Sequence, residues 1–451
     1  MTVRVANAAG FWGDYPDATE RLLASGAEFE YLQLEYLAEV TMGVLDRLRD
    51  RDSEKGYATD FVEYVVAEHL AELVDRDVRV VTNAGGLNPS SCAARVREHA
   101  AEQGVDVTVA TVTGDDLTDQ LDGLHAQYGL EPFEDDTPYE DVADDVVTAA
   151  AYLGAFPVAA ALDRGADVVI TGRVVDPALA LGPLIHEYGW GREQYDRLAA
   201  GIVAGHLIEC GTQVSGGNST REWEAIEYDD VGYPIAAVES DGEMRLAKPD
   251  GTGGEVSRAT VAQQLVYEIG DPRAYLTPDV AADFTAPEIT DVGDDTVAIT
   301  GCEGSAPPDS YKVSVHFENG YRVAGNMLYS RPDALAKAKR AASVIETRIE
   351  DRGLSVWDTR AEFVGHDAAH GPAAPDRDDH NEVLLRFAAR GPEREDLRRL
   401  GTEFAPLSLA GPPSVTGLTD SGRPRPRPII DVWPTLVPKS VVEPEVSVGE
   451  R

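Results

Sequence analysis

The chain has 451 residues, a length that favours two or three domains, and 43% of them are hydrophobic, enough for a sizeable core. Its 39 basic and 80 acidic residues give a net charge of −41 at pH 7. A field of this sign repels nucleic acid and anionic membrane surfaces, so we exclude both as general partners. Only six basic residues are lysines, and this composition predicts adaptation to high salt, where screening makes self-repulsion tolerable.

The first part of the chain alternates short apolar runs with amphipathic segments. The expected strands are residues 3–8, 29–35, 78–83, 107–112 and 167–171, and the expected helices are 18–25, 57–75, 89–103, 149–164 and 195–210. Strands that alternate with helices predict an α/β fold with a mainly parallel, doubly wound sheet. Because the apolar runs are continuous, we expect helices on both faces of this sheet.

The pattern changes after about residue 295. Short strands are expected at 296–300, 311–317, 321–328 and 382–389, and helices at 332–351 and 392–404. The Asn319-Gly320 pair predicts a tight hairpin between the second and third of these strands. We therefore expect an α/β domain with a ligand cleft at residues 1–295, followed by a smaller α+β domain at 296–451 with a Pro-rich tail.

The cysteines and the N-terminal sequence indicate the cellular compartment in which the protein is expected. Cys92, Cys210 and Cys302 lie far apart and show no metal-type spacing, so we expect neither a disulfide nor a structural zinc. The opening segment MTVRVANAAG lacks the basic and apolar regions of a signal peptide, and no run approaches 18 apolar residues. These features predict a cytoplasmic protein.

Glycines and polar residues follow every predicted strand of the α/β domain. In open α/β sheets ligands bind beyond the carboxyl ends of the strands, so such residues are expected to meet in one cleft. One loop of this kind is ordinary turn chemistry, but five at one sheet edge indicate a ligand site. The residues expected to bind substrate there are Gly10, Phe11, Asn83, Gly85, Gly86, Asn88, Thr171, Gly172 and Asp176.

Four charged residues at this edge are candidates for catalysis. Glu35, Asp115 and Asp116 suit general acid–base roles if crowding or burial raises the pKa of one of them. Asp115-Asp116 also offers oxygen ligands for Mg²⁺, although no cofactor is identified by a motif. Arg173 suits a clamp on a carboxylate or phosphate, and its alternative role is an ion pair with Asp176. Asn88, for its part, is expected mainly to cap the helix that begins at Pro89.

A second group of loops lies in the middle of the chain. Paired glycines before helices suit contact with an anion through backbone N–H groups; these are Gly216, Gly217, Gly253 and Gly254. Cys210 is read as a small buried side chain rather than a nucleophile. The cluster His366, Asp367, His370, Asp376, Asp378, Asp379 and His380 resembles metal ligands, but Gly365 and Gly371 interrupt any helix there, so no metal site is predicted.

Several segments together resemble a known family in type and order. They are AGFWGD (9–14), LEYLAE (34–39), VTNAGGLNP (81–89), VTGDDL (112–117), ITGRVVDPALALGPLIHEYGW (170–190), AAGIVAGHLIECGTQVSGG (199–217), GTGGEVSRATVAQQLVYEI (251–269) and VWPTLVPK (432–439). This combination is similar to the acyclic terpene utilisation protein A (AtuA) family over about residues 3–439. The resemblance implies a role in the degradation of acyclic terpenes such as citronellol and geraniol through CoA thioesters, which is a pathway rather than a reaction.

Two functions follow as alternatives. The first is an enzyme of lyase, hydratase or hydrolase type that acts on a branched acyl-CoA or related carboxylate, with Glu35 and Asp115 or Asp116 as acid and base and Arg173 as clamp. No GxGxxG, P-loop, HExxH or GxSxG motif supports redox, NTPase, zincin or α/β-hydrolase chemistry. The second is a non-catalytic accessory subunit that binds an acyl-CoA. In either case the chain is a candidate homo-oligomer.

Overall fold

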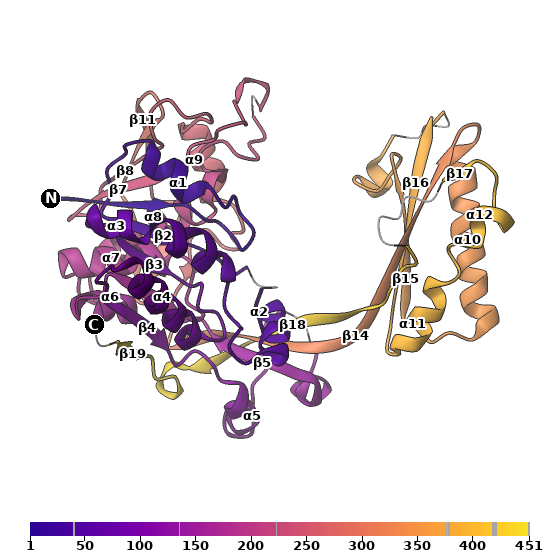
Figure 1. The fold of residues 1–451 in the computed structure, drawn as a ribbon, viewed down its shortest axis with the longest axis horizontal. Helices are drawn as coiled ribbons and strands as arrows, with labels where there is room; N and C mark the ends of the chain where they lie inside the picture. The colour runs from indigo at the N-terminus through magenta and orange to yellow at the C-terminus, as the bar shows by residue number, and fades with distance from the viewer. Residues whose placement is uncertain are drawn as a thin grey trace. The chain divides into compact units, whose positions relative to one another are not determined.

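The computed structural model describes residues 1–38, 41–134, 136–221, 223–375, 377, 379–416 and 422–449. The chain forms two compact units (Figure 1). Unit 1 comprises Met1–His316 and Val432–Arg451, and unit 2 comprises Phe317–Asp431. The predicted boundary at residue 295 separates two domains that would fold independently. The division into compact units does not test independent folding, so this boundary stays a prediction.

Unit 1 is built on a ten-stranded sheet in the order β11-β12-β8-β7-β1-β2-β3-β6-β4-β19. The five central strands β1 (Thr2–Asn7), β2 (Tyr31–Leu34), β3 (Arg79–Thr82), β6 (Val168–Thr171) and β4 (Val109–Thr113) are parallel to one another. Antiparallel strands flank them on both sides, namely β7 (Ile235–Glu239), β8 (Met244–Ala247), β12 (Thr296–Thr300), β11 (Glu288–Gly293) and β19 (Glu445–Val448). The α/β class is therefore confirmed, whereas the sheet as a whole is mixed, and a mainly parallel, doubly wound sheet is not confirmed.

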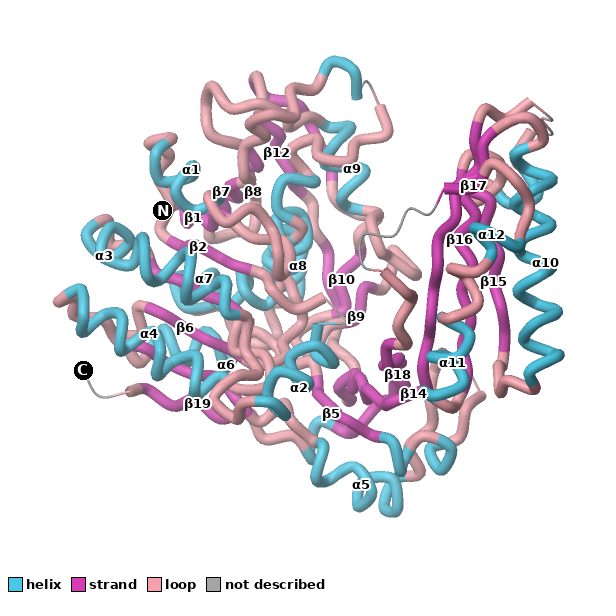
Figure 2. The backbone as a smooth tube through the Cα atoms, turned by 45° about the vertical axis from the view of Figure 1, so that its right-hand side comes forward, coloured by secondary structure: helices cyan, strands magenta, loops and turns pink. Residues whose placement is uncertain are grey.

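Helices cover both faces of the central strands (Figure 2). The side chains of Leu32 and Leu34 belong to one core cluster with Cys92 and Val96 of α4. Tyr31 points the other way, and its hydroxyl donates to Glu187 of α7 at 2.6 Å. The helices of unit 1 are α1 (Ala18–Ala24), α2 (Thr41–Arg51), α3 (Ala67–Asp75), α4 (Pro89–Gln103), α5 (Leu121–Tyr128), α6 (Phe156–Asp163), α7 (Ala178–Tyr188), α8 (Tyr195–Glu209) and α9 (Arg258–Leu265).

Local signals explain where some of these elements begin and end. The side chain of Asn88 caps α4 by accepting from the N–H of Ser91 at 3.2 Å, Pro89 occupies the first turn, and Gly104 closes the helix in the left-handed region. The predicted helix at 149–164 is wrong in its first part, where β5 (Val146–Ala151) precedes α6. An alanine-rich run is compatible with a helix or with a strand. Here the segment extends towards β14 (Ser310–Ser330), and the Tyr152 N–H donates to the carbonyl of Lys312 at 2.9 Å.

The predicted helix at 57–75 begins late. Its first turns form a π-helix over Phe61–Val66, which then continues as α3. A small three-stranded sheet, β13 (Glu303–Ser305), β10 (Ala281–Asp283) and β9 (Tyr275–Leu276), completes unit 1. Among the described residues no helix is long and apolar enough to cross a membrane.

Unit 2 is a twisted antiparallel sheet with helices on one face. Its strand order is β15 (Asp358–Val364), β16 (Glu382–Gly391), β14 (Ser310–Ser330) and β17 (Val415–Thr416), and β18 (Arg427–Pro438) also pairs with β14. Leu385 and Phe387 of β16 pack with Ala338 and Ile345 of α10 (Ala334–Arg352) in a second core, which α11 (Arg394–Gly401) and α12 (Leu407–Ala410) complete. Strands β14 and β18 contain residues of both units.

The predicted hairpin at Asn319-Gly320 is wrong. Gly320 has a φ of 66°, yet the chain continues through it as one strand, β14. The Asn319 side chain donates to Asp431 of β18 at 2.6 Å instead of closing a turn. The pairing of β14 with β16, which extends from Tyr321 to Ser330, therefore overrides the local turn signal.

Candidate functional site

Polar side chains from four parallel strands meet at the carboxyl edge of the central sheet. Glu35 follows β2, and its Oε1 accepts hydrogen bonds from the side chain of Asn83, after β3, and from the N–H of Leu37 at 2.8 Å. Asp115 follows β4, and its Oδ2 accepts from the N–H of Arg173, after β6, at 2.7 Å. The structure thus brings together four residues that the sequence placed at one edge.

Arg173 lies at the centre of this cluster and is only 4% exposed. Its Nη2 donates to Oδ1 of Asp176 at 2.5 Å, and its Nη1 donates to the carbonyl of Leu37. The guanidinium also lies over the ring of Tyr152, 4.2 Å from the ring centroid. The ion pair with Asp176 that the sequence offered as an alternative is therefore present, and Arg173 also fixes the loop after β2.

Two residues of α8 add a second pair of titratable groups. His206 Nε2 lies 2.9 Å from the carbonyl of Gln264, and its Nδ1 lies 3.0 Å from Oε1 of Glu209. Because a carbonyl only accepts, Nε2 must carry a proton. Burial lowers the pKa of His206 to about 4, so at neutral pH the Nδ1 atom is an acceptor and Glu209 donates to it.

Burial dominates the electrostatics of the carboxyl groups. It raises the pKa of Glu35 and Glu209 well above the usual range, and the nearby charge of Asp176 raises both further. Burial also raises the pKa of Asp176, against the attraction of Arg173, and raises that of Asp115 to about 7. Several carboxyl groups near one buried cation therefore have raised pKa values, which suits general acid–base chemistry.

Three predicted glycines have a packing reason at this edge. A Cβ at Gly172 would collide with the Asp115 carboxylate, one at Gly85 would lie 2.5 Å from the Thr171 carbonyl oxygen, and one at Gly10 would lie 2.8 Å from the backbone of Cys210. Gly10 thereby brings the loop after β1 against the end of α8. Close packing of loops explains these glycines without a bound anion, so anion contact there stays a prediction.

Other predicted residues do not point into the cluster or have a different role. Phe11 is 52% exposed, and Asn88 is the cap of α4. The N–H of Gly86 donates to the carbonyl of Asn83 at 3.1 Å. Asp116 is exposed and accepts from the backbone and side chain of Thr118, whereas Asp115 faces Arg173, so the two aspartates face different partners.

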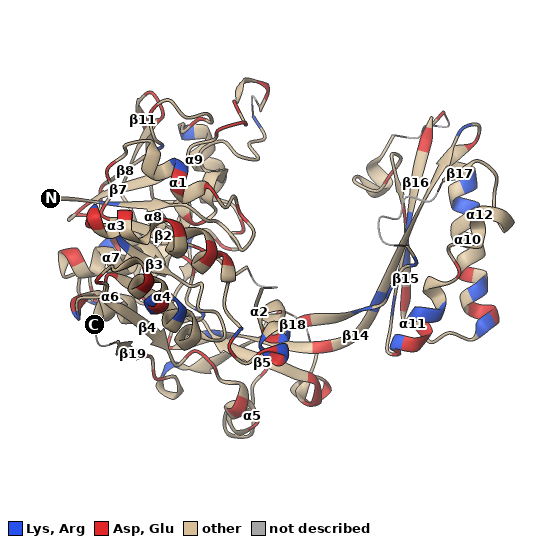
Figure 3. Ribbon diagram, viewed as in Figure 1, with Lys and Arg blue, Asp and Glu red and all other residues tan. Residues whose placement is uncertain are grey.

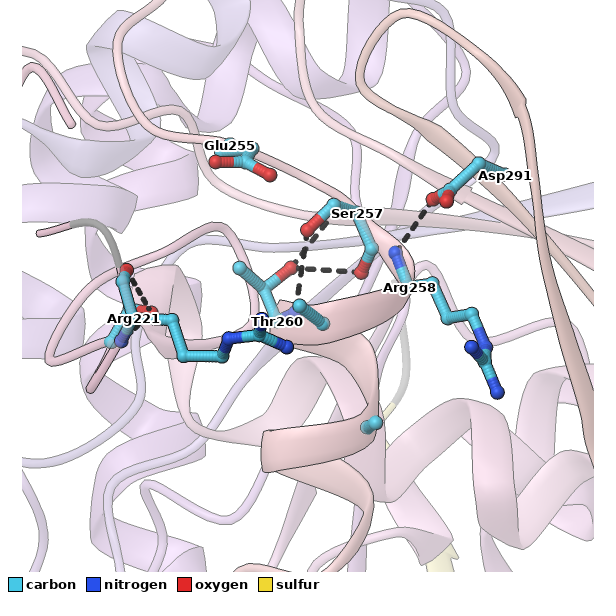
Figure 4. Close-up of a pocket in the computed structure, with 9 residues that line it drawn as sticks. Arg221, Glu255, Ser257, Arg258, Thr260 and Asp291 are labelled. Carbon is cyan, nitrogen blue, oxygen red and sulfur yellow. Dashed lines mark hydrogen bonds between the residues drawn. The ribbon is translucent and has the colours of Figure 1, made fainter. Parts of the chain in front are cut away.

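The two middle glycine loops are neighbours. The N–H of Glu255 donates to the carbonyl of Ser215 at 2.8 Å, which places Gly253 and Gly254 beside Gly216 and Gly217. A cavity of about 490 Å³ lies at the start of α9, close to these loops (Figure 4). Ser257 and Thr260 form a reciprocal cap there, so the helix supplies its own acceptors.

A second cavity of about 350 Å³ borders the carboxyl cluster. Gly217, Gln264 and Glu268 line it. Gln264 also accepts from His206, and the charge of Glu268 raises the pKa of Glu209. Two residues that line this cavity, Gln264 and Glu268, therefore act on the His206–Glu209 pair.

No group of three or more His, Cys, Asp or Glu side chains in the described part of the chain has a geometry that would hold a metal ion. Asp376 and Asp378, from the predicted histidine-rich cluster, lie outside the described residues, as does Glu39 of the LEYLAE segment. His366 and His380 lie near each other, with ring centroids 5.0 Å apart. Mg²⁺ binding stays a prediction.

Together these features define the class: a mixed α/β protein with a buried carboxyl–arginine cluster at the carboxyl ends of its parallel strands. The chain belongs to a known family, since the model described as acyclic terpene utilisation family protein AtuA matches residues 3–448. No curated protein and no solved structure matches the chain. Family membership supports a role in acyclic terpene utilisation, as the resemblance implied.

Proposed function

We propose that this member of the AtuA family is an enzyme that moves protons on a branched acyl-CoA or related carboxylate, in a reaction of lyase, hydratase or hydrolase type. The observation that supports this most directly is a pair of buried carboxyl oxygens. Oε2 of Glu35 and Oε2 of Glu209 have no hydrogen-bond partner among the described residues, although their side chains are anchored through Oε1. A buried, unpaired polar atom is costly unless a ligand completes it.

Glu35 is the proposed proton carrier. Asn83 and the N–H of Leu37 fix its Oε1, so the orientation of Oε2 is set by the fold. Burial raises the pKa of Glu35 from its usual acidic value towards neutral pH. A general acid or base is most effective when its pKa lies near the pH at which the enzyme works. Removal of a proton next to a thioester or carboxylate leaves negative charge on the substrate oxygen.

Arg173 supplies the compensating charge. It is nine-tenths or more buried, and in such a site a cation stabilises developing negative charge far better than in water. Glu209 is the second proton source, because it keeps its proton through burial and shares it with Nδ1 of His206. A base, an acid and a nearby cation are the groups that addition or elimination of water requires, and the charge of Arg173 acts on both Glu35 and Glu209.

The test is turnover of a panel of branched acyl-CoAs by the pure chain, with and without Mg²⁺, followed by mass spectrometry. We expect Glu35→Gln to abolish turnover while the melting temperature stays close to that of the native chain. Asp279→Asn is the matched control, because Asp279 is also a buried carboxyl of unit 1 but accepts from the N–H of Ala155. Equal loss in both variants would contradict the role of Glu35.

One observation favours the second candidate, a non-catalytic subunit that binds an acyl-CoA. Glu35 and Arg173 are each only 4% exposed, so these two side chains are largely shielded from bulk water. A buried polar cluster of this kind can also serve structure alone. Binding of acyl-CoA without turnover, unchanged in Glu35→Gln, is the result that would establish this alternative.

A further inference from the structure

The sheet of unit 2 has two different faces. In the pairing of β14, β16 and β15, Arg322 stands opposite Arg390, and Arg390 stands opposite Asp358. Because side chains alternate along a strand, these residues share one face, whereas Val323 and Ala389 point into the core beneath α10. The face that carries the arginines is the one opposite that core.

Small residues make this face hollow. Ala324 and Ala388 are paired across β14 and β16, and Arg360 of β15 is the next residue in the same row. Together with the segment that leads into β18, they line a groove of about 1000 Å³. Its arginines are Arg322, Arg360, Arg386, Arg390, Arg423, Arg425 and Arg427. Figure 3 shows basic residues on these strands in a molecule that is otherwise rich in acidic ones.

The segment 423–427 presents its arginines in an ordered way. Arginine and proline alternate, and the prolines turn inward: Pro426 is buried and the Pro424 carbonyl lies against Gly401. The three arginines between and beside them are exposed. Since proline fixes φ, this presentation costs little additional conformational entropy when a ligand binds.

Positive charge exceeds negative charge in this groove. Arg390 bonds Asp358 at 2.7 Å, and Glu362 is shared by Arg386 and Arg360. The charge of Asp431 also acts on Arg390. Within the described part of the chain, no ion pair involves the remaining four arginines, which are Arg322, Arg423, Arg425 and Arg427.

We propose that this groove binds a small ligand that carries a diphosphate or several phosphate groups. Guanidinium forks match phosphate oxygens in pairs, and clustered arginines repel one another until an anion neutralises them. The groove volume suits a ligand of nucleotide size, and the alanine floor offers an apolar surface for its organic part. The proposal is independent of the reaction proposed for unit 1.

The net charge of the chain argues for a small ligand rather than a nucleic acid. A long polyanion would be repelled by the net charge of −41 on the whole chain. A small anion inside the groove is screened from charges more than about 10 Å away at moderate salt. A diphosphate therefore experiences mainly the local arginines. Single-stranded DNA is the comparison that tests this point.

The experiment is isothermal titration of the full chain with inorganic pyrophosphate, ADP and coenzyme A, with citrate and a short single-stranded DNA as competitors of different chemistry. The variant replaces three unpaired arginines, as Arg322→Gln, Arg423→Gln and Arg425→Gln. The matched control has the same net charge but changes three exposed arginines on α10 and α11, as Arg340→Gln, Arg394→Gln and Arg398→Gln.

We expect the native chain and the control to bind at least one phosphate ligand more tightly than citrate or DNA. The groove variant should bind it about tenfold to hundredfold more weakly. If pyrophosphate binds as tightly as ADP or coenzyme A, the diphosphate alone is recognised. If the larger ligands bind more tightly, their organic part also contributes to the affinity. Both results support the proposal. Equal affinity in the groove variant, no binding at about 1 mM ligand, or preference for DNA would overturn it.

Discussion

Positive charge has opposite surroundings in the two units. In unit 1 the buried Arg173 forms an ion pair with Asp176 and lies near Glu35 and Glu209, whose pKa values burial raises. In unit 2 seven arginines line an open groove, and the carboxylates Asp358 and Glu362 compensate only some of them. Because Arg173 is buried, its ion pair affects the stability of the fold and the pKa values of the neighbouring carboxyl groups. Because the arginines of unit 2 are exposed, they affect the binding of anions, and their effect depends on ionic strength.

The largest expected effect is on unit 1. Replacement of Arg173 by methionine leaves Asp176 and the loop at Leu37 without their partner, so Arg173→Met should lower the free energy of unfolding by about 3–5 kcal/mol. Arg360→Met, in the open groove of unit 2, should change it by less than about 1 kcal/mol. Urea unfolding measures both, and equal losses would remove the contrast between the units.

Arg173→Lys is an intermediate case. Lysine keeps the charge but cannot hold Asp176 and the Leu37 carbonyl with one planar fork, so both stability and ligand affinity should fall. A loss of affinity in this variant therefore does not by itself show that Arg173 touches a substrate. The two structural contacts of Arg173 make Glu35 and Glu209 better probes of function.

The pH dependence of stability should come from unit 1. Asp115 has its pKa raised to about 7, so the folded state holds this proton where the unfolded state has released it. Its stabilising contribution is complete below about pH 4 and is lost by about 1.4 kcal/mol per pH unit as the pH rises towards 7.

His206 acts in the opposite direction, because its lowered pKa makes stability rise with pH between about 4 and 6.5. Asp115→Asn keeps an acceptor for the Arg173 N–H and removes the titration. The pH slope of this variant should therefore be less negative than that of the native chain, and an unchanged slope would contradict the burial argument.

Salt should stabilise the whole chain. A net charge of −41 destabilises the compact state by self-repulsion, which molar KCl screens. Melting temperatures should rise by several degrees from low salt to molar KCl, while phosphate binding in the groove of unit 2 weakens. Identical melting temperatures would count against adaptation to high salt.

The smallest stability effect is expected for an exposed pair in unit 2. Asp358→Asn removes the partner of Arg390 and should cost no more than about 1 kcal/mol. The same change adds positive charge to the groove, so the affinity for pyrophosphate should increase. Calorimetry of this variant separates the two effects, and weaker pyrophosphate binding would contradict the charge argument.

Much of unit 1 is predictable from local signals. Continuous apolar runs indicate all five parallel strands, and the Asn88-Pro89 start with the Gly104 end sets the bounds of α4. The rule that the carboxyl ends of parallel strands share one edge is enough to bring Glu35, Asn83 and Asp115 together. The rule fails for Asp116, because adjacent residues need not face the same partner.

The remainder depends on contacts between distant segments. The Asn319-Gly320 turn signal is overridden by the long pairing of β14, and no local pattern shows such pairing. His206 and Glu209 reach the site from α8, far along the sequence. Their signal is present in the chain: two titratable groups at i and i+3 on a helix that is apolar on all sides, and therefore buried.

The central claim is that Glu35 and Glu209 exchange protons with a substrate beside Arg173. The most direct measurement is deuterium incorporation from D₂O into branched acyl-CoAs, followed by mass spectrometry, for the native chain, Glu35→Gln, Glu209→Gln and the control Asp279→Asn. For the lyase and hydratase forms of the proposal, in which a proton moves to or from carbon, the account predicts incorporation with the native chain and the control, and none with Glu35→Gln. No incorporation by the native chain into any acyl-CoA, or equal incorporation by Glu35→Gln, would contradict it.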